Sequence, residues 1–248
     1  MTQAVGIDIG GTGIKGAVVD LETGTLHTDR VKRSTPEGGE PEAILDTVVD
    51  LVNELGVTDH TVPVGVCFPA VVVDGRTMSA ANISKAWIGL EAERLFEKAL
   101  GRNIHFVNDA DAAGVAEARF GAARGIRGLV IMTTLGTGIG SAFVYNGTLV
   151  PNSELGHLEI DGFDAEERAA NSAREREDLS WDEWAKRLQR YYSHVEALFS
   201  PSLFIVGGGV SKNQDQFLPL LKLRTPIVAA TLRNNAGILG AAALAVAP

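Results

Sequence analysis

The sequence predicts an α/β fold, and three observations lead to this expectation. Short apolar runs alternate with longer segments in which apolar residues recur at the helical period. The composition, 45% hydrophobic and 21% charged, is that of an ordinary globular protein. A Gly-rich segment occurs twice along the chain. Alternating strands and helices favour a sheet covered by helices, and the repeat suggests two related halves.

Length and composition limit the function classes. The 248 residues suffice for one large domain or two small ones, and 22 Lys plus Arg against 31 Asp plus Glu give a net charge of -9. This balance disfavours non-specific nucleic-acid binding, so no nucleic-acid partner is expected. The single cysteine, Cys67, cannot form an internal disulfide, and no Cys/His cluster has zinc spacing. We therefore predict a cytoplasmic, zinc-free protein.

Neither export nor membrane insertion is expected. The N-terminal residues lack a basic segment followed by an apolar core. The longest apolar stretch, Ala236–Ala247, is about half of the roughly 20 residues that cross a bilayer, and its Ala and Gly content suits a tightly packed helix.

Apolar runs and helical periodicity locate the expected elements. The predicted strands are Ala4–Ile9, Gly16–Val19, Val62–Val66, Ile104–Val107, Leu129–Met132, Ser141–Tyr145, Leu203–Val206 and Pro226–Ala230. The predicted helices are Pro41–Leu55, Leu90–Leu100, Ala110–Phe120, Trp181–Phe199 and Ala236–Ala247. The segment 163–178, rich in Glu and Arg, is expected to be an exposed helix or an ordered loop.

The helix predicted at Trp181–Phe199 has a clear pattern. Ser180 is a suitable N-cap, and the apolar and aromatic residues, Leu198 included, fall on one stripe. We interpret this stripe as the face that packs on the core.

The repeated segments are Gly11–Asp20 and Gly136–Tyr145, which align without gaps and both begin Gly-Thr-Gly-Ile. Each follows a predicted strand and ends near a turn, so each is predicted to form a β-hairpin with a Gly-rich bend. Small residues alone would also permit a tight hairpin. Two such copies suggest duplicated halves that face a cleft.

The Gly-rich bends are suited to phosphate. Glycine lets the backbone N–H groups approach phosphate oxygens closely, and a Thr hydroxyl adds a donor. The Walker A pattern is absent, and a strand rather than a helix follows each bend, so the common nucleotide loops do not match. Asp8 precedes the first bend and could hold a divalent cation through water, or could simply form a turn.

Two further groups of polar residues are candidates for chemistry. Asn108 and Asp109 follow a predicted strand and start a helix, where ligands collect in α/β sheets. Asp109 could accept a proton there, or could only cap the helix. Glu154 and His157 follow the second bend, and could bind a ligand or form a surface turn.

These pieces occur together and in the order typical of one family. The sequence resembles the ROK family of sugar kinases, within the actin and hexokinase superfamily, and among them the polyphosphate glucokinases. The resemblance extends over essentially the whole chain. It rests on Asp8–Gly16, Ser79–Gly89, Val107–Gly114, Thr133–Ala142, Glu154–Glu159 and Ile205–Lys212.

The resemblance implies a role for each matching residue. Asp109 would be the general base that takes the proton from the 6-hydroxyl of glucose, and Asp8 would hold Mg²⁺. The implied sugar ligands are Asn82, Asn108, Glu154, His157 and, less securely matched, Glu166. The implied phosphate-binding residues are Gly10, Gly11, Thr12, Gly13, Lys15, Thr134, Gly136, Thr137 and Gly138. Gly207, Gly208 and Gly209 match the family's nucleotide-binding motif.

At one segment the sequence differs from most members of the family. Most family members have a Cys-rich zinc motif between the counterparts of His157 and Glu166, whereas this chain has Leu158–Ala165, without cysteine. The polyphosphate glucokinases share this departure, which removes the zinc.

The implied fold is α/β, with two actin-like (ribonuclease H-like) lobes around a central cleft. We expect lobes at 1–108 and 109–248, with the helix at 236–247 packing back across the boundary. The family also implies a homodimer.

The phosphoryl donor is left open between polyphosphate and ATP. A polyphosphate track would need cations, and the candidates are Lys15, Lys85, Arg119, Arg124, Arg127 and Lys212. Each of them could equally be a solvated surface charge.

The alternative functions are those of a strictly ATP-dependent hexose kinase, a polyphosphate hydrolase and a sugar-sensing regulator. A hydrolase has no need of sugar ligands, and only seven residues precede Asp8, too few for the DNA-binding segment of the regulators.

Overall fold

The computed structural model describes residues 3–80 and 83–246. They divide into two compact units, one of residues up to 116 together with those from 234 onward, the other of residues 117–233. The division falls inside a helix, α3 (Asp109–Phe120), eight residues later than the boundary expected from the sequence. The C-terminal helix α7 (Ala236–Leu244) belongs to the first unit.

The first unit is built on a mixed sheet. Its strand order is β3-β2-β1-β5-β8, with β4 also paired to β2. β1 and β2 form an antiparallel hairpin, whereas β1, β5 and β8 run parallel. The strands are β1 (Gln3–Ile9), β2 (Gly13–Asp20), β3 (Thr25–Leu26), β4 (Val31–Ser34), β5 (Val64–Phe68) and β8 (His105–Asn108).

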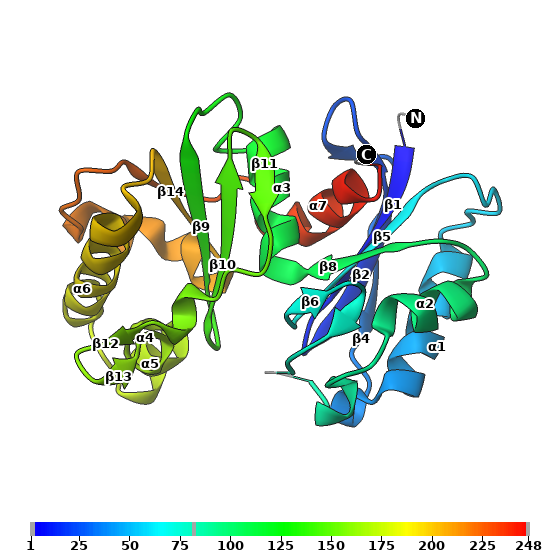
Figure 1. Ribbon diagram of the computed structural model, residues 1–248, viewed down its shortest axis with the longest axis horizontal. Coiled ribbons are helices and arrows are strands. Elements are labelled where there is room, and N and C mark those ends of the chain that lie inside the picture. The colour runs from blue at the N-terminus through cyan, green and yellow to red at the C-terminus, as the bar shows by residue number, and fades with distance from the viewer. Residues whose placement is uncertain (1–2, 81–82, 247–248) are drawn as a thin grey trace. The chain divides into compact units, whose positions relative to one another are not determined.

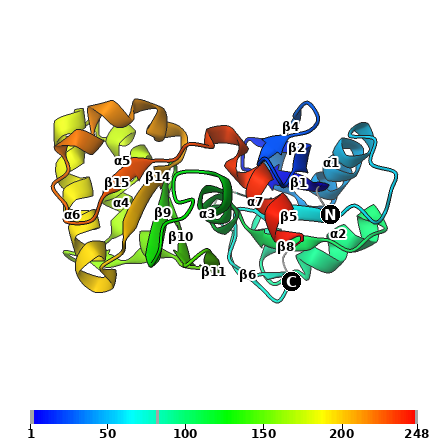
Figure 2. The ribbon, with the colours of Figure 1, turned by 90° about the horizontal axis from the view of Figure 1, so that it is seen from above.

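Alternation along the strands sends side chains to two different layers. Ile7 and Val66 are buried in the core that the sheet shares with α1 (Pro41–Glu54) and α2 (Ala92–Leu100). The intervening residues face α7, which lies across β1 and β5 (Figure 2). A Cβ on Gly6 or Gly65 would collide with the backbone of α7, so glycine permits this close packing.

The second unit repeats this design. Its strand order is β11-β10-β9-β14-β15, again an antiparallel hairpin continued by parallel strands. The strands are β9 (Leu129–Leu135), β10 (Ile139–Tyr145), β11 (Thr148–Val150), β14 (Leu203–Gly207) and β15 (Ile227–Ala229). In both units, therefore, an antiparallel hairpin comes first and parallel strands follow, as in actin-like folds. The prediction of an actin-like α/β fold is confirmed.

The long helix α6 (Trp181–Phe199) covers one face of the second sheet (Figure 1). It begins with the predicted cap, because Ser180 and Glu183 form a capping box. Trp184, Leu188 and Tyr192 are buried against the sheet, as the stripe predicts. The prediction is wrong at the end of the helix, where Leu198 and Phe199 are 55% and 36% exposed.

Shorter elements complete the two units. The small strand pairs are β6 (Val72–Val73) with β7 (Arg76–Thr77) and β12 (Glu159–Ile160) with β13 (Phe163–Asp164). The segment 163–178 forms β13, α4 (Ala165–Ala169) and α5 (Asn171–Arg176). The 3₁₀ helices are η1 (Glu37–Gly39), η2 (Lys85–Trp87), η3 (Leu155–His157), η4 (Gly209–Gln216), η5 (Leu218–Leu220) and η6 (Arg233–Asn235). No helix in the described part of the chain is long and apolar enough to cross a membrane.

Candidate functional site

The first Gly-Thr-Gly bend joins β1 to β2 and is closed by one backbone hydrogen bond. The Gly10 N–H donates to the Gly13 carbonyl at 3.0 Å. Thr35, just after β4, holds the bend: its hydroxyl donates to the Gly10 carbonyl at 2.5 Å and its N–H to the Thr12 carbonyl at 3.4 Å. Gly11 and Thr12 themselves are exposed. Hydrogen bonds to the carbonyl groups of the bend thus fix its backbone, while Gly11 and Thr12 stay accessible to a ligand.

Asp8 lies beside this bend, and side chains on the two neighbouring strands contact it. Register pairs Asp8 with Lys15 on β2 and with Cys67 on β5. The Lys15 Nζ is 3.4 Å from the Asp8 Oδ2, and the Cys67 Sγ donates to the Asp8 Oδ1 at 3.7 Å. Both charged side chains are partly buried. The lysine therefore neutralises a carboxylate that would otherwise repel phosphate.

Asn108 and Asp109 lie where β8 becomes α3. The Asn108 Oδ1 accepts the N–H groups of Ala110 and Asp111 at 2.8 and 3.0 Å, and its Nδ2 donates to the Ala70 carbonyl at 3.0 Å. Asn108 is thus the helix N-cap and is 8% exposed. The capping role considered for Asp109 is filled by its neighbour, although the Asp109 carboxylate also accepts the Ala110 N–H at 2.8 Å.

The carboxylates of Asp8 and Asp109 both influence the pKa of the Cys67 thiol. Burial raises the pKa of the Cys67 thiol well above its ordinary value, and the negative charges of Asp8 and then Asp109 raise it further. Both carboxylates therefore act on one buried thiol at the carboxyl ends of β1, β5 and β8. In α/β sheets this is the edge at which ligands bind.

The second Gly-Thr-Gly bend joins β9 to β10 and is one residue shorter than the first. The Gly136 N–H donates to the Gly138 carbonyl at 3.0 Å. Ser172 at the start of α5 holds it: its hydroxyl donates to the Thr137 carbonyl at 2.6 Å and its N–H to the Gly136 carbonyl at 3.0 Å. Thr134 precedes this bend on β9, in register with Gly140.

Glu166 on α4 reaches the base of the second bend. Its Oε2 accepts the Ile139 N–H at 2.9 Å. A Cβ on Gly138 or Gly156 would collide with or crowd this carboxylate, so glycine at both positions leaves room for it. Glu166 is therefore fixed against the bend.

Glu154 precedes η3 and His157 ends it, and Asp164 connects His157 to α4. The His157 Nδ1 is 2.9 Å from the Asp164 Oδ2, while the Asp164 Oδ1 accepts the Glu166 N–H at 3.2 Å. The hydrogen bond to Asp164 raises the pKa of His157, and the charges of Glu166 and Glu154 add to this effect against partial desolvation. Although Glu154 is exposed, neighbouring atoms partly desolvate its carboxyl and raise its pKa; His157 opposes this and Glu166 adds to it.

His157, Asp164 and Glu166 also present ligand atoms within 4.8 Å of one another, a spacing that could accommodate a metal ion. All three groups already have protein partners, since Asp164 bonds His157 and Glu166 accepts the Ile139 N–H. The arrangement equally presents carboxylate and imidazole groups to the hydroxyls of a neutral sugar.

The glycine run Gly207–Gly209 adjoins the second bend. Gly207 at the end of β14 pairs with Thr134. Gly208 has a φ of 81°, and a Cβ there would collide with the Leu135 backbone. The run therefore lets the chain turn away from the sheet directly beside the bend, with Gly209 open to its surroundings.

The structure thus gathers the predicted residues into one group per unit. Asp8, Lys15, the first bend, Asn108 and Asp109 share the strand ends of the first unit, whereas the second bend, Glu154, His157, Glu166 and Gly207–Gly209 belong to the second. Asn82 lies outside the described residues. Sequence reasoning missed Thr35, Ser172 and Asp164; no local signal marks the first two, whereas Asp164 could have been suggested as the N-cap of a short helix.

Comparisons with known proteins find similar sequences and structures. A sequence profile of the ROK family matches residues 4–171. The chain is 49% identical over 243 residues to the polyphosphate glucokinase of Mycobacterium tuberculosis (strain CDC 1551 / Oshkosh), covering 98% of this chain and 91% of that protein.

Solved structures extend the likeness. The inorganic polyphosphate/ATP-glucomannokinase from Arthrobacter sp. strain KM is 55% identical, with a TM-score of 0.93 and coverage of 99% of this chain and 98% of that one. A ROK family glucokinase from Streptomyces griseus, solved with glucose and AMPPNP, is 26% identical, with a TM-score of 0.82 and coverage of 98% of both chains. The chain belongs to the ROK family.

Proposed function

We propose that this protein transfers a phosphoryl group from inorganic polyphosphate, and also from ATP, to the 6-hydroxyl of glucose, giving glucose 6-phosphate. The names of the relatives that are 49% and 55% identical over nearly the whole chain support a kinase with these donors. The structural observation that carries the proposal is the pair of Gly-Thr-Gly bends, each closed by a backbone hydrogen bond and held by a hydroxyl residue. One is accompanied by the carboxylates Asp8 and Asp109, the other by Glu154, His157 and Glu166.

In this proposal Asp109 is the general base. Phosphoryl transfer has a loose transition state, so positioning the acceptor hydroxyl and stabilising charge account for most of the catalysis. Asp109 orients the 6-hydroxyl and takes its proton as the new P–O bond forms. The P–O bond between the terminal phosphorus and the rest of the donor breaks, and the donor leaves one phosphate shorter. Asn108 caps α3 and thereby holds the adjacent Asp109 at the sheet edge.

The sugar itself is neutral, so its binding depends on directional hydrogen bonds. We assign Glu154, His157 and Glu166 to the sugar hydroxyls, together with the remaining N–H of Asn108 and with Asn82. Asp164 fixes the imidazole of His157 through Nδ1, which leaves Nε2 to contact the sugar.

Each bend offers backbone N–H groups and a Thr hydroxyl to donor phosphates, and Lys15 adds a positive charge. Gly207–Gly209 would accommodate the nucleotide when ATP is the donor. The expected zinc-free site, homodimer, absence of nucleic-acid and membrane partners and cytoplasmic location remain predictions.

Kinases of this kind typically use a divalent cation, and we assign Mg²⁺ to Asp8. The residues fit: the Asp8 carboxylate is partly exposed, and it shares its surroundings with a second carboxylate, Asp109. Mg²⁺ keeps several waters and is commonly bound through one or two carboxylates plus substrate phosphates. When bound, it would neutralise charge on the donor phosphates.

The test is the initial rate of glucose 6-phosphate formation with ATP, tripolyphosphate and long-chain polyphosphate, each at low and moderate salt. We expect activity with ATP and long-chain polyphosphate, with a Michaelis constant for polyphosphate that falls as the chain lengthens and rises steeply with salt. The Michaelis constant for glucose, which is neutral, should barely respond to salt. Activity with ATP alone would make this a strictly ATP-dependent kinase, and phosphate release without glucose would make it a hydrolase.

A further inference from the structure

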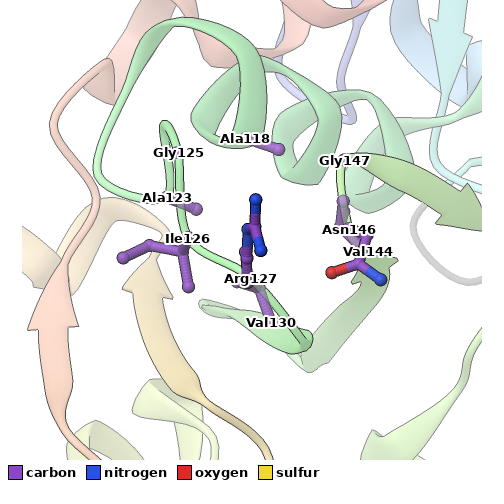
Figure 3. A pocket seen from close by; sticks show the side chains of 9 residues that line it. All are labelled: Ala118, Ala123, Gly125, Ile126, Arg127, Val130, Val144, Asn146 and Gly147. Atoms are coloured by element: carbon purple, nitrogen blue, oxygen red, sulfur yellow. The ribbon is translucent and has the colours of Figure 1, made fainter.

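A pocket of 430 Å³ lies in the second unit, away from the residues assigned above. It is formed by the last turn of α3, the loop that follows it and the turn between β10 and β11. Its lining includes Ala118, Ile126, Arg127, Val130, Val144 and Asn146. We call it the arginine pocket, because the Arg127 guanidinium lies in the middle of the lining residues (Figure 3).

Arg127 provides the only charge among the residues that line this pocket. Its guanidinium makes no hydrogen bond or ion pair with any residue in 3–80 or 83–246, unlike Arg176, Arg187 and Arg190 of the same unit, which all pair with carboxylates. A guanidinium that faces a pocket with its donors unused can bind an anion without first breaking a salt bridge.

Asn146 supplies a second donor. Its Oδ1 accepts the Gly128 N–H at 2.8 Å, which fixes the side chain and leaves Nδ2 without a partner among the described residues. Figure 3 shows Asn146 beside Arg127 in the lining. Together the two side chains offer a charged and a neutral donor to one ligand.

The local charge is opposite to that of the whole protein. Residues 118–153 contain no Asp or Glu but three arginines, Arg119, Arg124 and Arg127, in a chain whose net charge is -9. All three arginines are exposed. A stretch of chain that carries cations without acids is the local feature that an acidic protein needs to attract a polyanion.

The pocket is remote from the second Gly-Thr-Gly bend. Val130 and Val144 pair near the start of β9 and the end of β10, whereas the bend joins the opposite ends of these strands. The strands are seven residues long, so the separation is roughly 20 Å. An anion bound here is therefore not the phosphate that reacts.

We propose that the arginine pocket is a secondary binding site for phosphate groups of a polyphosphate chain, with Arg127 and Asn146 as its ligands. This inference rests on the proposed function, because a long chain of phosphates is the donor whose other groups could occupy a site distant from the reacting end. Tripolyphosphate and ATP are too short to reach from one end of the hairpin to the other.

The test compares wild type with Arg127→Gln and, as a charge-matched control, Lys186→Gln on the exposed surface of α6. For R127Q we expect the Michaelis constant for long-chain polyphosphate to rise on the order of 3- to 10-fold, and the dependence of its logarithm on log salt to lose a slope of about one. The values for ATP, tripolyphosphate and glucose and the melting temperature should stay at wild-type levels, and K186Q should match wild type throughout.

Equilibrium binding of long-chain polyphosphate, measured by calorimetry without glucose, separates this inference from the proposed function. Weaker binding by R127Q than by wild type and K186Q supports the pocket, whether or not the bound chain is a donor. Equal binding by all three proteins overturns the pocket, while glucose 6-phosphate formation from polyphosphate would still support the proposed function. If the wild type binds polyphosphate but forms no glucose 6-phosphate from it, the result contradicts polyphosphate as the donor and leaves the pocket proposal intact.

Discussion

The two Gly-Thr-Gly hairpins show what has been kept and what has changed between the halves of this chain. Each bend closes on one backbone hydrogen bond, and each is held by a hydroxyl residue that donates both its side chain and its N–H to carbonyls of the bend. Thr35 does this after a strand and Ser172 at the start of a helix. The bends differ in length by one residue and in the carbonyls that the hydroxyls reach, so both halves keep a Gly-rich bend held by a hydroxyl residue without keeping one geometry.

The strand positions behind the bends differ in chemistry. Asp8 pairs with Lys15 behind the first bend, whereas Thr133 pairs with Ser141 behind the second. Where the first hairpin has a partly exposed ion pair, the second has a fully buried hydroxyl that bonds the Tyr192 hydroxyl at 2.6 Å. Both halves present backbone donors, while the first hairpin also pairs a carboxylate with a lysine behind its bend.

The largest effect should come from removing the base. Asp109→Asn keeps the shape of the side chain and the nearby helix cap, but an amide cannot take a proton. We expect the turnover of glucose to fall on the order of 10²-fold or more, with a smaller change in glucose binding. Single-turnover kinetics and glucose calorimetry would measure the two effects, and near-normal turnover would leave Asp109 with a structural role only.

The two bends should respond alike when they are loosened. Thr35→Val and Ser172→Ala each remove one hydroxyl that holds a bend carbonyl, and we expect each to lower kcat/KM for the phosphoryl donor about tenfold. Thr35→Ser and Ser172→Thr keep the hydroxyl and serve as controls. If only Thr35→Val changes donor kinetics, the second hairpin is a structural copy without a role in phosphate binding.

A smaller effect concerns the imidazole of the second unit. Asp164→Asn retains an N-cap for α4 but removes the charge beside His157, so the pKa of His157 should fall toward 6.5. Because the raised pKa belongs to the folded state, the stabilisation is fully present below pH 6.5 and is lost as the pH rises through the folded-state pKa.

NMR titration of His157 measures the shift directly, and urea unfolding of both proteins at acidic and alkaline pH measures its consequence. A stability difference that grows with pH would contradict the assignment.

Much of this arrangement could be predicted from the sequence, because the repeat and the strand pattern are local signals. Gly11–Gly13 and Gly136–Gly138 indicated two bends, and the strand preceding Asp109 indicated its place at a sheet edge. The hydroxyl residues that hold the bends could not be predicted, since Thr35 and Ser172 reach them from 23 and 35 residues away along the chain.

The sequence also could not show which of Asn108 and Asp109 caps the helix α3. Both residue types cap helices well, and only the geometry shows that the Asn108 oxygen bonds the first turn of α3. Likewise, the exposure of Leu198 depends on where the sheet under α6 ends, which periodicity does not report.

The central claim is that Asp8 behind the first bend serves the reaction, whereas Thr133 behind the second bend stabilises the fold. A paired comparison of Asp8→Asn with Thr133→Val tests it most directly. Initial rates of glucose phosphorylation and urea unfolding would be measured for both variants beside wild type. We expect Asp8→Asn to lose tenfold or more of its activity, on the order of one charged interaction, with near-normal stability.

Thr133→Val should keep near-normal turnover but lose about 1–2 kcal/mol of stability, because the buried Tyr192 hydroxyl loses its partner. An Asp8→Asn variant with wild-type activity, or a Thr133→Val variant that is stable but inactive, would contradict the account.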